Sequence, residues 1–407
     1  MKWKVCSIGD FVDAGLADIQ TGPFGTQLKA SDYVSEGTPV INVRNIGFGD
    51  LRSEKLEYVN EQTADRLSAH LLRENDIVFG RKGAVDRHLF VTPDQAKWMQ
   101  GSDCIRLRLG TDDVSARFIS CGLLRAEHQQ WMLSQSGNKA TMASLNHDVI
   151  KRIALNLPPR HLQDDIVATL SAYDDLMVNN RQRMELLEQA ARLLYQEWFV
   201  RLRFPGYEHT RITNGIPEGW VRKRLADIAE VNRATLSGSY DKELEYVDIA
   251  SVVPGQITGT TTFDARDAPS RARRVVQHGD IIWSCVRPNR RSHAVIWKPA
   301  DNLIVSTGFA VITPTAVPTT FMYFATTTDA FVGYLANHAR GAAYPAVVAS
   351  DFERAEVLVP PKRLLNAFDE IVAPTFYQVH NLRQQNQKLR AARDHLLPRL
   401  MSGEIAV

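Results

Sequence analysis

The chain has 407 residues, of which 44% are hydrophobic and 23% are charged, and its formal net charge is +2 at pH 7. This length exceeds a single typical core and indicates two to four domains, while the composition is ordinary for a globular protein. Four scattered cysteines without a CxxC pair argue against a disulfide scaffold or a zinc ribbon. We see neither a signal peptide nor a membrane-spanning apolar run in the sequence, and we expect a cytoplasmic protein.

The first block, residues 1–157, combines short strands with one helical stretch. Apolar runs bounded by turn residues predict strands at 38–43, 76–79, 88–91 and 104–109. The last of these alternates apolar with polar residues, as a half-buried strand does. Helical periodicity follows this strand. The segments together predict a domain of mixed α/β type.

A pair of prolines ends this block. Pro158-Pro159 is followed by a long helical pattern, because the residue before a proline avoids helical geometry and a helix can begin only after it. Apolar residues recur there at alternating steps of four and three, which is the spacing of a coiled-coil seam, with Asn180 as an off-pattern member. The seam residues that we assign are Ile166, Leu170, Met177, Leu187 and Leu194.

The second block, residues 211–359, repeats the first in the same order. Four segments match: 220–228 with 3–11, 279–282 with 75–78, 307–312 with 101–106, and 355–361 with 153–159. Loop lengths differ between the copies, which favours two related readers of different targets, although an old duplication without a recognition role would leave the same pattern. A duplicated chain has pseudo-twofold symmetry, and duplex DNA is a nearly symmetric partner that suits it.

A second long helix follows Pro360-Pro361, with Arg393 as an off-pattern member of its seam. Because each helix has an apolar stripe that must be buried, we predict that the two pack on each other as an antiparallel coiled coil. The alternative is that each helix docks on its own block. The predicted fold class is therefore α+β, with two mixed α/β domains separated by a long two-helix coiled coil. The seam residues of the second helix are Phe368, Val372, Leu382, Leu389 and Leu396.

Positive charge gathers in the second block rather than in the first helix. Residues 271–298 hold seven lysines or arginines and a single acid, Asp280. Base reading in the major groove needs forked donors and amides, and phosphate contacts need Lys, Arg and small hydroxyls. We therefore predict DNA contacts in the loop after strand 279–282. The candidates there are Arg287, Asn289, Arg290, Arg291 and His293.

The equivalent loop of the first block follows strand 76–79 and is also basic. The polar, glycine-containing loops before each Pro-Pro pair are further candidates, and so is the end of strand 38–43. Each of these loops can equally be an ordinary solvated loop. The residues that we select are Arg81, Lys82, Arg87, His88, Arg44, Asn45, Asn138, Lys139, Arg340 and Tyr344.

Three segments resemble one known family. They are the run Leu194-Tyr195-Gln196-Glu197-Trp198-Phe199-Val200, the re-entry Ile216-Pro217-Glu218-Gly219-Trp220, and the C-terminal stretch 396–405. Together with the alternation of variable blocks and long helices, they resemble the specificity subunit of type I restriction-modification systems. The resemblance covers essentially the whole chain.

The resemblance implies a division of labour. Residues 1–157 and 211–359 would be target recognition domains, each reading one half of a split DNA sequence, and residues 158–205 and 360–407 would be spacer helices. The helices would also dock two methyltransferase subunits, which carry S-adenosylmethionine, and restriction or translocase subunits, which use ATP and Mg²⁺. This subunit would be non-catalytic, without a cofactor or metal of its own.

The sequence shows no GxxxxGK[ST] phosphate loop, no methyl-donor loop and no Asn-Pro-Pro-Tyr motif, which agrees with a non-catalytic role. Two other functions stay open. A two-headed protein-interaction scaffold would agree with the modest net charge, but it would usually dilute the arginines of residues 287–291 with acids. An enzyme with an unrecognised site is the third possibility.

Overall fold

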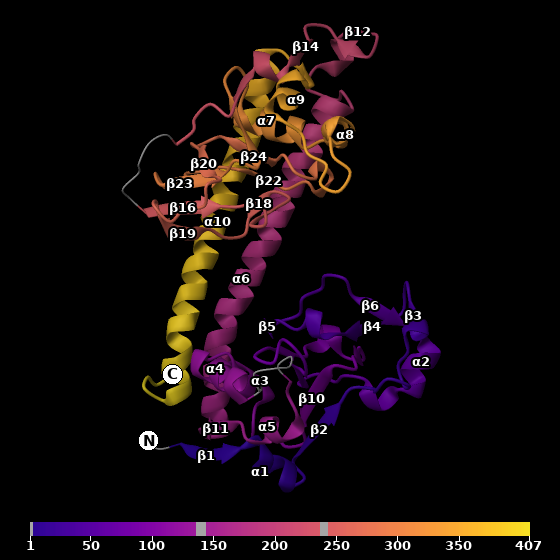
Figure 1. Ribbon diagram of the computed structural model, residues 1–407, viewed down its shortest axis with the longest axis vertical. Helices are drawn as coiled ribbons and strands as arrows, with labels where there is room; N and C mark the ends of the chain where they lie inside the picture. Colours follow the sequence, from indigo (N-terminus) through magenta and orange to yellow (C-terminus); the bar gives the residue numbers. More distant parts are fainter. Residues whose placement is uncertain (1–2, 136–143, 237–242) are drawn as a thin grey trace. The chain divides into compact units, whose positions relative to one another are not determined.

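The computed structural model describes residues 3–135, 144–236 and 243–407 (Figure 1). The chain forms two compact units. Unit 1 combines Met1–Val178 with Asn386–Val407, and unit 2 is Asn179–Gln385. Two long helices, α6 (Arg160–Tyr195) and α10 (Lys362–Ser402), contribute residues to both units.

The main sheet of unit 1 has five strands in the order β2-β10-β7-β8-β5, antiparallel except for the parallel pair of β5 and β8. A second sheet has the order β3-β6-β4-β9, and β1 pairs with β11. The strands are β1 (Lys4–Ser7), β2 (Ala17–Thr21), β3 (Tyr33–Val34), β4 (Thr38–Ile41), β5 (Phe48–Gly49), β6 (Glu57–Val59), β7 (Ile77–Gly80), β8 (His88–Phe90), β9 (Met99–Gln100), β10 (Cys104–Leu109) and β11 (Ala154–Leu157).

Short helices complete unit 1, and side chains cap several of them. Ser7, for example, accepts a hydrogen bond from the backbone N–H of Asp10 at the start of α1. The core joins Phe79 and Leu107 of the main sheet to Phe118 of α3 and to residues of both long helices. The short helices are α1 (Ile8–Asp13), α2 (Glu61–Arg66), α3 (Ala116–Leu123), α4 (Ala126–Gln135) and α5 (His147–Lys151).

Unit 2 repeats this plan with strands in the order β15-β24-β21-β22 in its main sheet and β19-β16-β23-β20 in its second sheet. The pair β14 and β25 corresponds to β1 and β11. The elements are β14 (Val221–Arg224), β15 (Ala229–Val231), β16 (Glu243–Val247), β19 (Thr261–Asp264), β20 (Ala272–Val275), β21 (Ile281–Ser284), β22 (His293–Val295), β23 (Leu303–Ser306), β24 (Phe309–Pro314), β25 (Glu356–Val359), α7 (Thr319–Thr326), α8 (Asp329–His338) and α9 (Ala349–Arg354), with the hairpins β12 (Ile212–Thr213), β13 (Ile216–Pro217) and β17 (Val252–Val253), β18 (Gln256–Ile257).

Strand register shows which residues of the two units are equivalent. The match of 279–282 with 75–78 makes Trp283 the equivalent of Phe79. Phe79 pairs with Ile105 in unit 1, and Trp283 pairs with Ala310 in unit 2, so Ile105 and Ala310 are equivalent. Cys104–Leu109 therefore corresponds to Phe309–Pro314, whereas the match of 307–312 with 101–106 placed this strand one residue out of register. A shift of one residue moves every side chain to the opposite face of the sheet, so the structural register is the one that matters.

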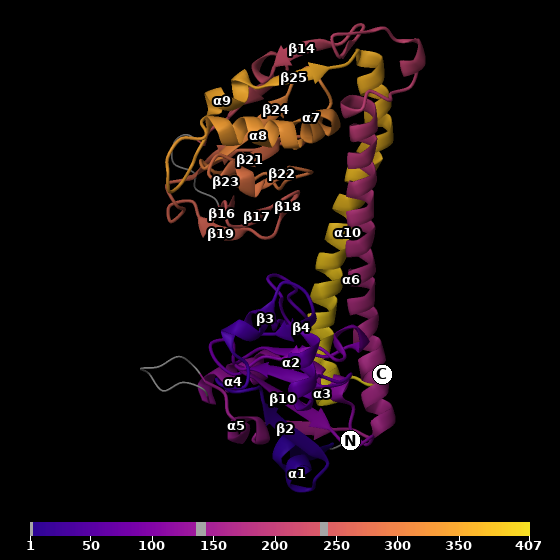
Figure 2. The same cartoon turned by 90° about the vertical axis from the view of Figure 1, so that its right-hand side faces the viewer.

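The long helices are antiparallel neighbours, and Figure 2 shows them side by side. Within unit 1, the Asn386 Nδ2 donates to the carbonyl of Met177 at 3.1 Å. Within unit 2, Arg383 pairs with Glu188 at 2.9 Å, and the rings of Phe368 and Phe199 lie 5.0 Å apart. Residue numbers rise along one helix as they fall along the other, which confirms the antiparallel coiled coil.

All ten predicted seam residues are buried or half-buried. The helices also pack on the domains, because Ile166 and Leu400 belong to the core of unit 1, and Val372 belongs to that of unit 2. The two alternatives for helix packing are thus realised together. Of the off-pattern residues, Arg393 forms an ion pair with Asp174 across the helix pair.

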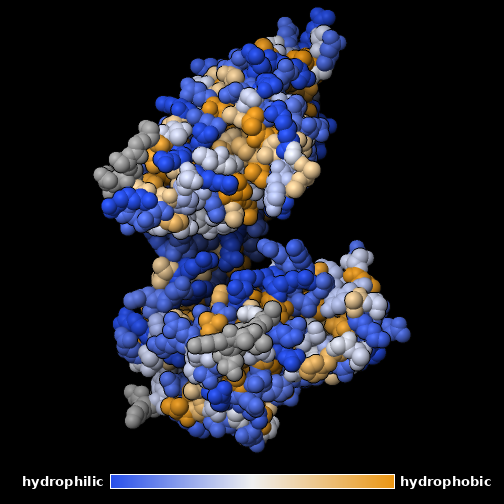
Figure 3. Space-filling model, in the orientation of Figure 1, coloured by the Kyte–Doolittle hydropathy of each residue, from blue (hydrophilic) through white to orange (hydrophobic). Residues whose placement is uncertain are grey.

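Apolar side chains are collected inside each unit, while the face drawn in Figure 3 is mainly hydrophilic with scattered apolar residues. In the described part of the chain, no helix has the length and apolar character that a membrane span requires. Each helix starts where the sequence predicts, since α6 begins directly after Pro158-Pro159 and α10 directly after Pro360-Pro361.

Candidate nucleic-acid interface

Two loops that are far apart in the sequence meet in unit 1. The loop after β7 pairs with the segment before α5 through a β-bridge between Lys82 and Ser144, and the N–H of Leu145 donates to the carbonyl of Arg81 at 2.7 Å. The sequence named the loop after β7 as a candidate, but it did not name residues 144–145 or show that they adjoin this loop. The other loop that it named, residues 134–139, lies mostly outside the described residues. The two adjoining segments form one surface of unit 1, which we call loop pair 1 (residues 81–87 and 144–145).

The same two loops meet in unit 2. The N–H of Val347 donates to the carbonyl of Cys285 at 2.9 Å, and the N–H of Arg287 donates to the carbonyl of Pro345 at 2.7 Å. A β-bridge between Val286 and Ala346 lies between these bonds. We call this surface loop pair 2 (residues 285–292 and 339–347). Both units therefore build a two-loop surface at the same place in the fold.

Arg287 organises loop pair 2. Its guanidinium lies 4.7 Å from the ring centroid of Tyr344, a cation–π contact, and its Nη2 donates to the carbonyl of Ala343 at 3.1 Å. Tyr344 is 69% exposed, so the stacked pair sits at the surface. A planar cation on an exposed ring is one way to hold a forked donor ready for a base or a phosphate.

The turn that follows Arg287 has an unusual backbone. Arg287 and Arg291 adopt left-handed φ angles of 50° and 55° on either side of a 3₁₀ turn, Pro288–Arg290. This conformation is costly for a residue with a Cβ, and it concentrates at functional loops. Pro288 is buried in this turn, whereas Asn289 and Arg290 are exposed.

Two other arginines of loop pair 2, Arg291 and Arg340, form ion pairs with acids. Arg291 pairs with the exposed Asp329, and this contact is the first cause of the lowered pKa of that carboxyl. Arg340 lies 3.4 Å from Asp351, which is itself buried. Arg290 has no ion pair with any residue that the structure describes. Its positive charge is therefore the least compensated in the loop pair.

In loop pair 1, the guanidinium groups of two arginines make cation–π contacts with aromatic rings. The guanidinium of Arg81 lies 5.2 Å from the ring of Phe24, and that of Arg87 lies 5.2 Å from the ring of Phe48. Sequence reasoning missed both phenylalanines, which are 55% and 41% exposed. The available signal was an aromatic residue directly before a glycine in each turn, Phe24-Gly25 and Phe48-Gly49.

Two further candidates of unit 1 are paired with acids. The Nζ of Lys82 lies 3.2 Å from Asp103, and Arg44 lies 2.6 Å from Glu57. All four partners are between 43% and 49% exposed, so these pairs can exchange with a phosphate at little cost. Asn138 and Lys139 lie outside the described residues.

Three candidates are inside the protein, which corrects the prediction that they contact DNA. Asn45 is fully buried, and its Nδ2 donates to the carbonyls of Arg52 and Glu54. His88 is hydrogen-bonded to the Ser120 Oγ at 2.8 Å, and His293 lies 4.8 Å from the ring of Trp283. Burial lowers the pKa of each histidine to about 3, so both are neutral core residues.

The reason for this error is structural equivalence. His88 and His293 are the first residues of β8 and β22, and both strands hold the same place in their sheets. Their recurrence in the sequence reflects a shared position in the core. Recurrence therefore identifies the scaffold as readily as it identifies a function.

Comparison with known proteins agrees with this architecture. Residues 1–189 match the family model of the "Type I restriction modification DNA specificity domain". The chain is 24% identical to the type I restriction enzyme MjaIX specificity subunit of Methanocaldococcus jannaschii, over 70% of this chain and 68% of that protein. It is 20% identical to the type I restriction enzyme HindI specificity subunit of Haemophilus influenzae, over 89% of this chain and 94% of that protein.

A solved structure has the same fold. The S subunit of a type I restriction-modification system from M. genitalium superposes with a TM-score of 0.58 and 16% sequence identity. The match covers 98% of this chain and 96% of that chain. The duplicated plan of domain and long helix is thus found in a protein of very different sequence.

Proposed function

Because this chain belongs to the family of type I restriction-modification specificity subunits, we propose that it recognises a bipartite DNA sequence, one half with each loop pair. It docks methyltransferase and restriction subunits, which carry S-adenosylmethionine and use ATP and Mg²⁺, and it catalyses no step itself. The observation that carries this proposal is the recurrence of a basic two-loop surface on equivalent scaffolds, with different residues in each copy.

The residues of the two loop pairs fit the chemistry of DNA reading. Arg287 and Arg290 offer forked donors for guanine or phosphate, and Asn289 offers the paired donor and acceptor that adenine requires. In unit 1, Arg81 and Arg87 offer the same fork from a stacked position. Because the side chains differ while the backbone plan is shared, the two units would read different half-sites.

We assign the spacing of the half-sites to the helix pair. Helix α6 has 36 residues, which corresponds to about 54 Å at ~1.5 Å per residue. Such a helix is stable because its apolar stripe is covered by α10. A coiled coil resists bending, so its length would fix the gap between the two half-sites.

The helices also carry a second apolar stripe, which we assign to the methyltransferase subunits. Leu186 and Leu193 recur at an interval of seven on α6, with 65% and 57% exposure, and Val200 in the π-helical turn Gln196–Val200 that follows is 57% exposed. Residues at this interval share one face of a helix. Ile371 of α10 adds a further exposed side chain. Exposed apolar stripes beside a buried seam are typical of helices that bind a further helix.

The alternative function is a two-headed protein-interaction scaffold, and salt dependence separates it from DNA recognition. The chain, purified with its methyltransferase subunits, is titrated with a random duplex library at several salt concentrations. DNA recognition predicts enrichment of one bipartite sequence and a steep linear fall of log affinity with log salt. A scaffold predicts no enriched sequence, and that result would reject the proposed function.

A further inference from the structure

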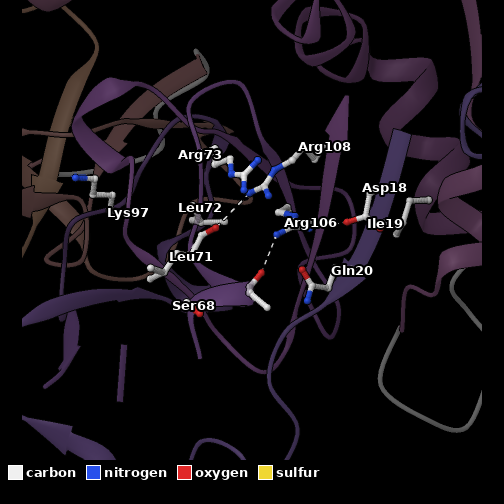
Figure 4. A pocket seen from close by; sticks show the side chains of 11 residues that line it. Asp18, Ile19, Gln20, Ser68, Leu71, Leu72, Arg73, Lys97, Arg106 and Arg108 are labelled. Carbon is white, nitrogen blue, oxygen red and sulfur yellow. Dashed lines mark hydrogen bonds and ion pairs between the residues drawn. The ribbon is translucent and has the colours of Figure 1, made fainter. Parts of the chain in front are cut away.

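A polar pocket lies in unit 1 on the main sheet, and none of its lining residues belongs to loop pair 1. It has a volume of about 670 Å³ and is lined by β2, β10, Lys97 and the segment Ser68–Arg73 (Figure 4). Four of its lining residues are cationic, against one lining carboxylate. The cations are Arg73, Lys97, Arg106 and Arg108, and the carboxylate is Asp18.

Arg106 is the innermost of these cations. Its side chain is only 3% exposed, its Nη2 donates to Asp18 at 2.6 Å, and its Nη1 donates to the carbonyl of Ala69 at 3.2 Å. Its Nε is buried and has no hydrogen-bond partner among the described residues. Asp18 is 64% exposed, so solvent screens its attraction to the buried positive charge of Arg106. A buried donor without a partner costs free energy, so the guanidinium of Arg106 is incompletely satisfied by the protein.

Arg108 adds a second positive charge on the same face of β10, because residues two apart on a strand point to the same side. It forms a bidentate pair with the buried Asp76, with both distances at 2.7 Å. Burial and then the neighbouring Arg108 lower the pKa of Arg106, which shows the mutual repulsion of the two cations. Since Arg73 and Lys97 are exposed lining residues, the pocket keeps an excess of positive charge.

The fold does not require these arginines. In unit 2 the positions of Arg106 and Arg108 are held by Val311 and Thr313, as the strand register shows. Val311 is 2% exposed and packs in the core, and the hydroxyl of Thr313 donates to Asp280 at 2.7 Å. The same sheet is therefore built without a buried guanidinium, so a scaffold role alone does not account for the arginine pair.

We propose that this pocket binds an oxyanion of the phosphate class, held by Arg106 and Arg108 with help from the exposed Arg73 and Lys97. Guanidinium groups match the geometry of phosphate oxygens and form their strongest hydrogen bonds with anions. The anion would be either a free phosphate or phosphate monoester, or a phosphate of the DNA backbone. The existence of the site does not depend on the proposed function, because it is a property of unit 1 alone.

The test is titration of the full-length chain with inorganic phosphate at constant ionic strength, followed by calorimetry. The expected result is saturable binding at one site. Arg73→Gln and Lys97→Gln should each weaken this binding severalfold, up to about tenfold for a charge-assisted contact. The matched control is Lys29→Gln, which removes an exposed lysine of unit 1 outside the pocket and should leave the binding unchanged.

The double variant Arg106→Val/Arg108→Thr gives unit 1 the side chains of unit 2, and it should abolish phosphate binding. If this variant does not fold, Arg73→Gln and Lys97→Gln decide the question, because both replace exposed side chains. Absence of saturable phosphate binding by the wild-type chain would overturn the proposal. Binding that is equally strong in both single variants and in the control would overturn it as well.

A second arm identifies the source of the anion. The two single variants, assembled with the methyltransferase subunits, are titrated with the recognised duplex over a range of salt. The slope of log affinity against log salt concentration is compared between each variant and the wild type. A slope that is smaller in magnitude by about one in the variant identifies a DNA backbone phosphate as the occupant. An unchanged slope, with phosphate binding weakened as above, identifies a free phosphate or phosphate monoester. Failure of DNA recognition as a whole would leave the calorimetric result intact.

Discussion

Asp76 and Asp280 occupy the same buried position at the start of equivalent strands, yet they are satisfied by different partners. Each accepts a hydrogen bond from a backbone N–H three residues earlier, that of Arg73 or that of Gln277. Asp76 then pairs with Arg108, whereas Asp280 accepts a hydrogen bond from the Thr313 hydroxyl. One scaffold thus holds either an ion pair or a neutral contact.

This difference predicts unequal effects of the same substitution. Asp280→Asn should change stability by at most about 1 kcal/mol, because a flipped amide can accept from Gln277 and donate to Thr313. Burial raises the pKa of Asp280, so the folded state already disfavours its charge. Asp76→Asn should cost about 3 kcal/mol, because it leaves the largely buried Arg108 without its carboxylate. Hydrogen exchange of β7 and β21 measures each unit separately, and equal losses would contradict this account.

The two buried histidines predict a loss of stability in acid. Because the folded-state pKa of His88 and His293 is lowered to about 3, the unfolded chain takes up protons at these residues first, near the ordinary value of 6.5. The unfolded state then binds more protons at these residues. The contribution of the two histidines to the free energy of unfolding is therefore constant above pH 6.5 and falls as the pH drops from 6.5 toward 3. The slope is about 1.4 kcal/mol per pH unit for each histidine.

The measurement is chemical denaturation at several pH values for the wild type, for His88→Gln and for His293→Gln. The difference between wild type and each variant removes the contribution of the carboxylates. His338→Gln replaces an exposed histidine and serves as the control. A difference that stays constant between pH 6.5 and 4 would show that the histidines are not buried in the neutral form.

Arg290 should be the most sensitive contact of loop pair 2. If the guanidinium reads a base, Arg290→Ala is expected to weaken DNA binding by about 1–3 kcal/mol and to reduce the sequence specificity at one position of one half-site. If it contacts phosphate instead, all sequences weaken alike and the salt slope falls by about one. The control is Arg222→Ala on β14, which is exposed and outside the loop pair. If the two substitutions change DNA affinity equally, Arg290 is not part of the DNA interface.

Neighbouring leucines of α6 separate the seam from the second apolar stripe. Leu194 packs against the core of unit 2, whereas Leu193 is 57% exposed. Leu194→Ala should lower the free energy of unfolding by about 2 kcal/mol, a partial cost because the residue is half-buried. Leu193→Ala should leave unfolding unchanged and weaken the methyltransferase complex, as measured by calorimetric titration. A stability loss at Leu193 without a binding defect would contradict the assignment of the stripe.

The long-range plan of the molecule could be predicted because its signals are local and repeated. A proline pair fixes where each helix begins, and a step of four and three residues fixes which face is buried, as Ile166 and Phe368 confirm. The pairing of distant loops could not be predicted, since the bond from Leu145 to Arg81 depends on tertiary folding. The histidines were misassigned because periodicity does not distinguish a polar side chain that is satisfied in the core from one that faces DNA.

The register of β24 shows a second limit. Five of the six residues of this strand are buried, and apolar residues lie on both of its faces. The sequence therefore lacks the alternation of apolar and polar residues that would show which residues face which side of the sheet. The alignment of 307–312 with 101–106 was therefore wrong by one residue, and only hydrogen-bond register showed that Arg106 corresponds to Val311.

The central claim is that each unit reads its own half of one DNA target, and exchange of one block tests it most directly. Residues 211–359 are replaced by the corresponding block of another specificity subunit, and methylated positions are mapped in cells that express the complete system. The account predicts that one half-site changes while the other half-site and the gap between them stay as they were. A change in both halves, or in neither, would contradict it.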